Sequence, residues 1–246
     1  MMPLHSHDVH LWTGQFVTGS ERHHWSVLNG AEQERAQRFV RERDRHRYIW
    51  ARGNLRCLLG DYLGIAPEAV AFCYGDRGKP YLAEHAVQFN LSHSGDWVVY
   101  AFTGDRPIGV DIEQLQRTKD WLPLAERFFC TSEAQALAAL PLSHQTPAFF
   151  KLWTRKEAYL KATGEGLQGL QDVAIAVNAP EQVIADPHGR WQILDLTHIS
   201  NYAGALSWQI PDPNPNVGAG LKPAPTDLGA ALAYESSNLT HFSLPT

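Results

Sequence analysis

Two acidic residues stand at alternate positions in the segment Gly109-Val110-Asp111-Ile112-Glu113. On a β-strand alternate side chains project from one face, so Asp111 and Glu113 would lie side by side. Their apolar neighbours, Val110 and Ile112, would then enter the core. Adjacent carboxylates repel each other unless a cation lies between them or one is protonated, and Mg²⁺ prefers hard oxygen ligands of this kind. The segment therefore indicates either a Mg²⁺ site or a strand end with two solvated acids.

A second pair of charged residues lies on a predicted helix. The apolar residues of this helix recur at helical spacing and form one buried stripe: Phe149, Leu152, Trp153, Tyr159 and Leu160. Glu157 and Lys161 are four residues apart and share a face. They are candidates for chemistry, but an ordinary surface ion pair has the same spacing and contributes only about a few tenths of a kcal/mol.

Candidate phosphate ligands lie earlier in the chain. Eight arginines occur between positions 35 and 56: Arg35, Arg38, Arg41, Arg43, Arg45, Arg47, Arg52 and Arg56. Guanidinium groups match phosphate oxygens, so a phosphate-rich ligand is plausible, whereas a solvated helix face would explain several of the eight. The turn 78–80 adds the cation Lys79, and the loop 90–94 adds the hydroxyl of Ser92 and the imidazole of His93. Neither fragment is specific alone.

The elements that position these residues follow from hydrophobic periodicity and turn residues. In the first half we expect strands at 10–12, 70–74, 87–91 and 97–102, with helices at 31–40 and 45–63, the latter capped by Gly64. In the second half we expect strands at 108–112, 173–177, 191–196 and 202–208, with helices at 132–140 and 147–163.

The repeated order predicts an α+β protein of two similar halves, each a helix plus a small antiparallel sheet. The predicted boundaries are 1–104, 105–210 and a Pro/Gly-rich insertion and tail at 211–246. Residues 211–227 should be mobile and dispensable, because Pro removes backbone donors and Gly raises the entropy cost of ordering.

Composition excludes several protein classes. The chain has 246 residues, 44% of them hydrophobic, which is enough for a real core. A net charge of −5 argues against non-specific nucleic-acid binding. The three cysteines have no metal-ligand spacing, and no stretch approaches about 18 apolar residues. We therefore expect a cytoplasmic protein that neither spans a membrane nor binds nucleic acid.

Taken together and in order, the motifs resemble one family, the Sfp-type 4′-phosphopantetheinyl transferases. The matching phrases are GKPYL at 78–82, FNLSHSGDWVVYAF at 89–102, GVDIE at 109–113, RFFCTSE at 127–133 and FKLWTRKEAYLKATGEGL at 150–167. The resemblance implies transfer of the phosphopantetheine arm of coenzyme A to a serine of an apo acyl or peptidyl carrier protein, with Mg²⁺ as cofactor and release of adenosine 3′,5′-bisphosphate. The resemblance also implies two pseudo-symmetric halves with the active site between them, and the chain length and motif spacing favour a monomer of the large class.

Carried over by position, the resemblance also implies residue roles. Asp111, Glu113 and Glu157 would hold the metal, and Glu157 would accept the serine proton. Lys161 would contact the diphosphate. The phosphates of coenzyme A would be bound by Arg47, Lys79, Ser92 and His93, with Arg35 on the 3′-phosphate. Two other classes remain open: a non-catalytic coenzyme A or carrier-binding module, and a Mg²⁺-dependent nucleotide phosphohydrolase.

Overall fold

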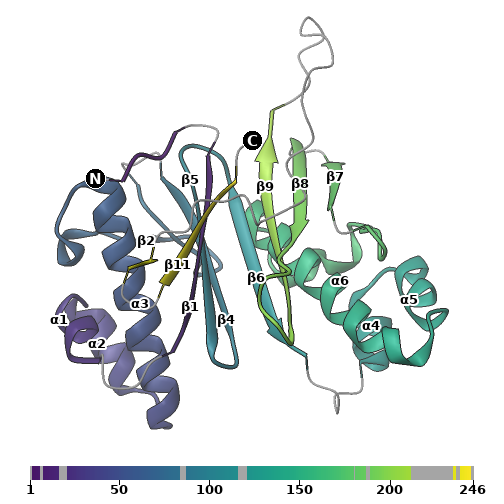
Figure 1. Cartoon of the computed structure of the whole chain (residues 1–246), viewed down its shortest axis with the longest axis horizontal. Helices are drawn as coiled ribbons and strands as arrows, with labels where there is room; N and C mark the ends of the chain where they lie inside the picture. Colours follow the sequence, from purple (N-terminus) through teal and green to yellow (C-terminus); the bar gives the residue numbers. More distant parts are fainter. Residues whose placement is uncertain are drawn as a thin grey trace, which may run out of the picture.

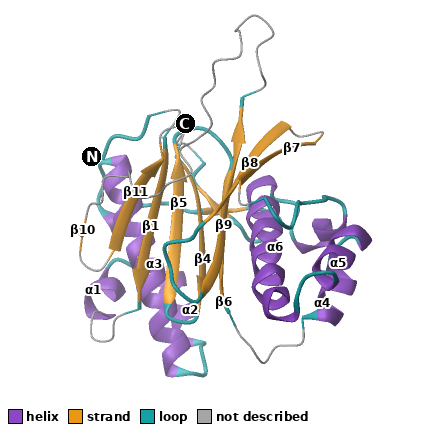
Figure 2. Ribbon diagram, turned by 45° about the vertical axis from the view of Figure 1, so that its right-hand side comes forward, coloured by secondary structure: helices purple, strands orange, loops and turns teal. Residues whose placement is uncertain are grey.

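The computed structural model describes residues 2–5, 8–16, 21–83, 87–115, 121–179, 181–186, 189–211, 235–236 and 239–244. Helices and antiparallel sheets are mixed along this part of the chain, which confirms the predicted α+β class (Figures 1 and 2). No helix in these ranges is long and apolar enough to cross a membrane. The Pro/Gly-rich segment at 212–227 lies outside the described residues.

The elements of the first half are β1 (Val9–Gln15), α1 (Glu21–Ser26), α2 (Gly30–Gln37), α3 (Glu42–Leu63), the 3₁₀-helix η1 (Pro67–Ala69), β2 (Cys73–Tyr74), β3 (Pro80–Tyr81), β4 (Gln88–Ser94) and β5 (Trp97–Thr103). Those of the second half are β6 (Ile108–Gln114), α4 (Leu122–Phe128), α5 (Thr131–Ala138), α6 (Leu142–Thr163), η2 (Leu167–Gln171), β7 (Glu181–Asp186), β8 (Gly189–Asp195) and β9 (Tyr202–Ile210). The short strands β10 (Glu235–Ser236) and β11 (Leu239–Leu244) follow.

Two antiparallel sheets carry the site. The first has the strand order β10-β11-β1-β5-β4, and the second has the order β6-β9-β8-β7. Strand β11 pairs along β1, from Val9 opposite Leu244 to Gly14 opposite Leu239. The last described residues of the chain therefore complete the sheet of the first half, whereas the sequence analysis grouped them with the tail.

The layers run helix, sheet, sheet, helix, with α3 on one outer side and α6 on the other (Figure 1). The strand period of two produces this arrangement. On β5, Tyr100 and its alternate neighbours pack under α3, while Val99 and Ala101 face the second sheet. Val110 and Ile112 of β6 meet them in that central core. As a result the opposite face of β6 is left for α6.

The two long helices were well indicated by the sequence. Helix α3 ends at Leu63 and is capped by Gly64, whose left-handed φ of 68° confirms the predicted glycine cap. Helix α6 is capped in the same way by Gly164, with φ 83°. Helix α6 begins at Leu142, five residues before the predicted start at Pro147, because a proline this close to the N-terminus removes only one helical hydrogen bond.

Two predicted strands were wrong in whole or in part. Of the run 70–74 only Cys73–Tyr74 is a strand, since a 3₁₀ turn occupies 67–69. The run 173–177 forms no strand. Its backbone groups are satisfied by side chains instead: Lys156 and Arg155 of α6 donate to carbonyls at 173, 176 and 177, and the amide of residue 175 donates to Glu133.

Candidate active site

The acidic strand is positioned as its alternation predicts. Val110 and Ile112 are buried between the sheets, and Asp111 projects toward α6 with only 5% of its surface exposed. Asp111 Oδ1 accepts hydrogen bonds from two residues that the sequence separates widely. They are Lys161 Nζ at 2.6 Å and Ser92 Oγ at 2.8 Å. This contact joins β6, α6 and β4 at one point.

Gly109 lets α6 approach the strand this closely. A Cβ at position 109 would lie 2.0 Å from the carbonyl oxygen of Ala158 and 2.5 Å from the amide nitrogen of Ala162. Both are backbone atoms of α6, so they cannot swing aside as a side chain would. Only glycine fits here, and the close packing places Glu157 and Lys161 over the acidic strand.

The pairing of Lys161 differs from what the helical spacing suggested. The ion pair of Lys161 is formed with Asp111, across the helix–sheet interface, and its ammonium also lies 3.3 Å from the carbonyl of Val110. Lys161 is therefore part of a partly buried polar centre, which argues against an ordinary surface pair with Glu157.

Glu157 has an unusual proton affinity. Burial, with the negative charges of Asp111 and Glu113 nearby, raises the pKa of Glu157 to about 7, although Lys161 partly offsets the effect. A carboxyl group with a pKa near neutrality exchanges its proton readily at physiological pH, which suits a general base.

The first half supplies the cation Lys79 from the turn that precedes β3. Its ammonium donates to the carbonyl of Lys161 at the end of α6 and, at 3.3 Å, to that of Ile108 on β6. Burial and the nearby charge of Lys161 lower the pKa of Lys79 to about 8. The predicted phosphate ligand thus also ties the two halves together.

His93 and Arg47 lie beside this centre. Arg47 Nη2 is 2.5 Å from Asp96 Oδ1, and its guanidinium lies over the ring of Phe16. The ring of His93 packs edge-on against the same phenylalanine. Partial burial, with the charges of Lys161 and Arg47, lowers the pKa of His93, so its neutral form is favoured.

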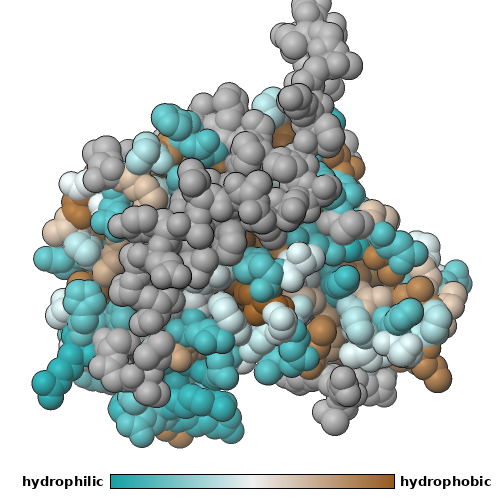
Figure 3. Space-filling model, in the orientation of Figure 1, coloured by the Kyte–Doolittle hydropathy of each residue, from teal (hydrophilic) through white to brown (hydrophobic). Residues whose placement is uncertain are grey.

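The arginine-rich segment divides into two groups. Arg52 and Arg56 are buried around Glu32, at 2.6 Å and 2.7 Å, and tie α3 to α2. Three more accessible members form ion pairs with nearby acids: Arg38 with Glu34, Arg43 with Asp44 and Arg45 with Glu42. The surface over the lower ends of α2 and α3 is mainly hydrophilic (Figure 3). Arg35 lies over the ring of Tyr48. The solvated-face interpretation therefore explains several of the eight.

The acidic region can accept a cation. Asp111 Oδ2 is buried and receives no hydrogen bond from the described part of the chain, so it is an acceptor with unused capacity. This fits Mg²⁺, which binds one or two carboxylates together with substrate phosphates. Within the described ranges, however, no three acidic, histidine or cysteine side chains already lie close enough to hold a metal ion.

Some residues of the site were missed by the sequence analysis. Glu113 Oε2 accepts a hydrogen bond from Ser94 Oγ at 2.9 Å, and the amide of Val110 donates to Asn90 Oδ1 at 2.9 Å. The sequence could have indicated them, because Asn90, Ser92 and Ser94 are polar residues at alternate positions of one strand and therefore share a face.

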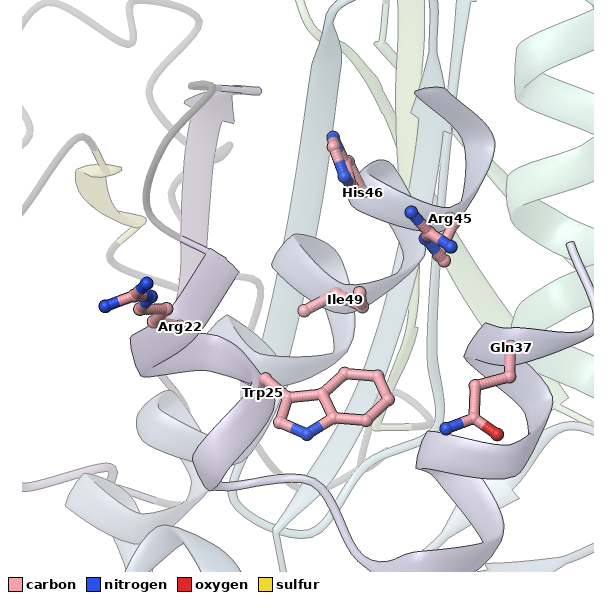
Figure 4. A pocket seen from close by; sticks show the side chains of 6 residues that line it. All are labelled: Arg22, Trp25, Gln37, Arg45, His46 and Ile49. Carbon is pink, nitrogen blue, oxygen red and sulfur yellow. The ribbon is translucent and has the colours of Figure 1, made fainter. Parts of the chain in front are cut away.

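A separate cavity of about 430 Å³ lies among α1, α2 and α3 (Figure 4). Its lining consists of Arg22, Trp25, Gln37, Arg45, His46 and Ile49. Arg45 is one of the eight arginines considered as phosphate ligands, but no residue of the acidic centre lines the cavity, so the two are different places in the fold.

Comparison with known proteins agrees with the resemblance of the motifs. Residues 107–207 match the sequence model of the 4′-phosphopantetheinyl transferase superfamily, and residues 19–104 match that of the 4′-phosphopantetheinyl transferase N-terminal region. The 4′-phosphopantetheinyl transferase HetI of Nostoc sp. strain PCC 7120 is 38% identical over 212 residues, covering 84% of this chain and 90% of the relative. The 4′-phosphopantetheinyl transferase Sfp of Bacillus subtilis strain 168 is 33% identical over 192 residues, covering 76% and 84%.

Proposed function

Because the chain belongs to the 4′-phosphopantetheinyl transferase superfamily, we propose that it transfers the 4′-phosphopantetheine arm of coenzyme A to a serine of an apo acyl or peptidyl carrier protein. The serine oxygen would form a bond to phosphorus as the diphosphate P–O bond breaks, and adenosine 3′,5′-bisphosphate would leave with the bond's electrons. The observation that carries the proposal is the contact of Asp111, Lys161 and Ser92, which joins three of the five matching phrases at the junction of the halves.

The acidic residues would form the metal site. Asp111, Glu113 and Glu157 would hold Mg²⁺, and the unused oxygen Asp111 Oδ2 supports this assignment. When bound, the metal would neutralise charge on the diphosphate oxygens.

The cations would bind coenzyme A and stabilise the leaving group. Lys161 is held beside Asp111 and would contact the diphosphate, where negative charge grows as the bond breaks. Lys79, Ser92, His93 and Arg47 would bind phosphate oxygens. The 3′-phosphate is assigned to Arg35, which lies farther out on α2.

The carboxyl group of Glu157 would take up the serine proton. Its location supports this role, because the charges of Asp111, Glu113 and Lys161 all act on its carboxyl group, which therefore lies in the same centre. The monomeric state and the cytoplasmic location stay predictions from the sequence.

One experiment tests the proposed function directly. The protein is incubated with coenzyme A, Mg²⁺ and an apo carrier protein, and the carrier is weighed by mass spectrometry. We expect the carrier to gain the phosphopantetheine mass, and to gain none when the metal is chelated. An Asp111→Asn variant, which keeps the shape and loses the charge, should be nearly inactive.

The same assay separates the competing functions. Adenosine bisphosphate released without carrier modification would indicate a phosphohydrolase. Coenzyme A binding with neither product would indicate a binding module. Either result would overturn the proposed transfer.

A further inference from the structure

The two halves meet along the edge strands β4 and β6, where side chains form the hydrogen bonds. Alternate residues of β4 reach across to β6. Asn90 Oδ1 accepts from the amide of Val110 at 2.9 Å, and Ser92 Oγ donates to Asp111 Oδ1 at 2.8 Å. Ser94 continues the series one step further along. These contacts set the register between the strand that carries the acids and the strand that carries the hydroxyls.

The hydroxyl group of Ser94 forms two hydrogen bonds. Its Oγ donates to Glu113 Oε2 at 2.9 Å and accepts from the amide of Gln114 at 3.0 Å. Because the backbone amide occupies a lone pair of the oxygen, the hydroxyl hydrogen is aimed at the carboxylate. The hydrogen bond therefore fixes the orientation of the Glu113 side chain.

The turn after Ser94 is packed tightly enough to hold this geometry. Gly95 has a left-handed φ of 53°, and a Cβ there would lie 2.4 Å from the hydroxyl oxygen of Tyr202. The amide of Asp96 donates to the same tyrosine hydroxyl at 3.3 Å. The end of β4 is thus bound to β9 as well as to β6, and Ser94 is anchored on both sides.

We propose that Ser94 is a positioning residue, which orients the carboxylate of Glu113 for cation binding through its hydrogen bond to Oε2. Groups that hydrogen-bond to metal ligands typically change metal affinity or activity by about 10- to 100-fold when they are removed. The inference rests on the proposed function, because that function gives Glu113 its role as a Mg²⁺ ligand.

The test compares Ser94→Ala with two further variants. Ser94→Thr keeps the hydroxyl, and β-branched residues are accepted in strands. Ser207→Ala removes a buried strand hydroxyl that has no hydrogen-bond partner in the described ranges, so it is the control for loss of a hydroxyl as such. Binding of Mn²⁺, as a spectroscopic substitute for Mg²⁺, is measured by electron paramagnetic resonance with coenzyme A present. The Mg²⁺ dependence of transfer and the melting temperature are measured in parallel.

We expect Ser94→Ala to weaken Mn²⁺ binding about tenfold or more and to raise the half-maximal Mg²⁺ concentration by a similar factor. Its KM for coenzyme A at saturating Mg²⁺ should stay near that of the wild type. Ser94→Thr should restore metal binding, and Ser207→Ala should resemble the wild type.

Other outcomes overturn the inference. A lower melting temperature of Ser94→Ala with unchanged metal affinity would show that Ser94 only ties the strands together. Failure of Ser94→Thr to restore binding would show that the hydroxyl is not the cause. If the wild type modifies no carrier, the proposed function fails, while Mn²⁺ binding still shows whether Ser94 supports a metal site.

Discussion

We expect Gly109→Ala to push apart β6 and α6, the two elements that carry the acidic residues and Lys161. The added Cβ would lie 2.0 Å from the carbonyl oxygen of Ala158, whereas ordinary contacts of this kind begin at 3.4 Å. Either α6 or β6 must therefore shift by more than about 1 Å, and a misplacement of about 1 Å can lower a rate about 100-fold. Forcing extra volume into a packed interface also costs about 1–3 kcal/mol of stability.

The measurement is steady-state transfer to an apo carrier, together with urea unfolding. Gly30→Ala is the matched control, because a Cβ at position 30 of α2 has no atom within 4 Å. We expect Gly109→Ala to lose about 100-fold in kcat while remaining folded, and Gly30→Ala to keep normal activity. Near-normal kcat and stability for Gly109→Ala would refute the argument that close backbone packing positions Glu157 and Lys161.

Three further predictions follow from the same contacts. Lys161→Ala should lower kcat by about 10²- to 10³-fold, with a smaller rise in the KM for coenzyme A, because under the proposed function its contact with the diphosphate would be strongest in the transition state; a kcat close to normal would mean that Lys161 is only a structural partner of Asp111. With the pKa of Lys79 at about 8, the KM for coenzyme A should rise by up to about fivefold from pH 8 to 9, and Lys79→Arg should remove this rise; equal pH profiles would contradict the role. Burial lowers the pKa of His198 to about 4 from 6.5, so the unfolded chain binds the proton first and stability is lost as the pH falls between these values. The free energy of unfolding is measured by urea unfolding at pH 7 and at pH 4.5. Between these pH values we expect His198→Gln to lose about 2 kcal/mol less of this free energy than the wild type.

The long helices and the acidic strand could be predicted because their signals are local. Periodic apolar residues and the terminal glycines Gly64 and Gly164 define α3 and α6. The alternation around Asp111 defines which residues of β6 enter the core between the sheets and which face α6. Each of these features depends on residues within a few turns or one strand, so no knowledge of the tertiary structure is needed.

Other parts of the fold depend on contacts between residues far apart in the chain. The apolar run 173–177 has a strand-like composition, yet Arg155 and Lys156 take its carbonyl oxygens. Lys156 is fully buried with Glu133 at 2.9 Å, and no local pattern distinguishes it from an exposed helix lysine. The pairing of β11 with β1 joins residues that are more than two hundred positions apart.

The candidate site shows the same division between local and distant information. Helical spacing correctly places Glu157 and Lys161 on one face, but it suggests that they pair with each other. The structure pairs Lys161 with Asp111 instead, because Gly109 brings α6 against the strand and leaves the buried carboxylate in need of a partner. In free protein this ion pair neutralises both charges. When Mg²⁺ and a diphosphate are bound, Asp111 would pair with the metal and Lys161 with the phosphate oxygens. Ligand binding would therefore replace one ion pair by two.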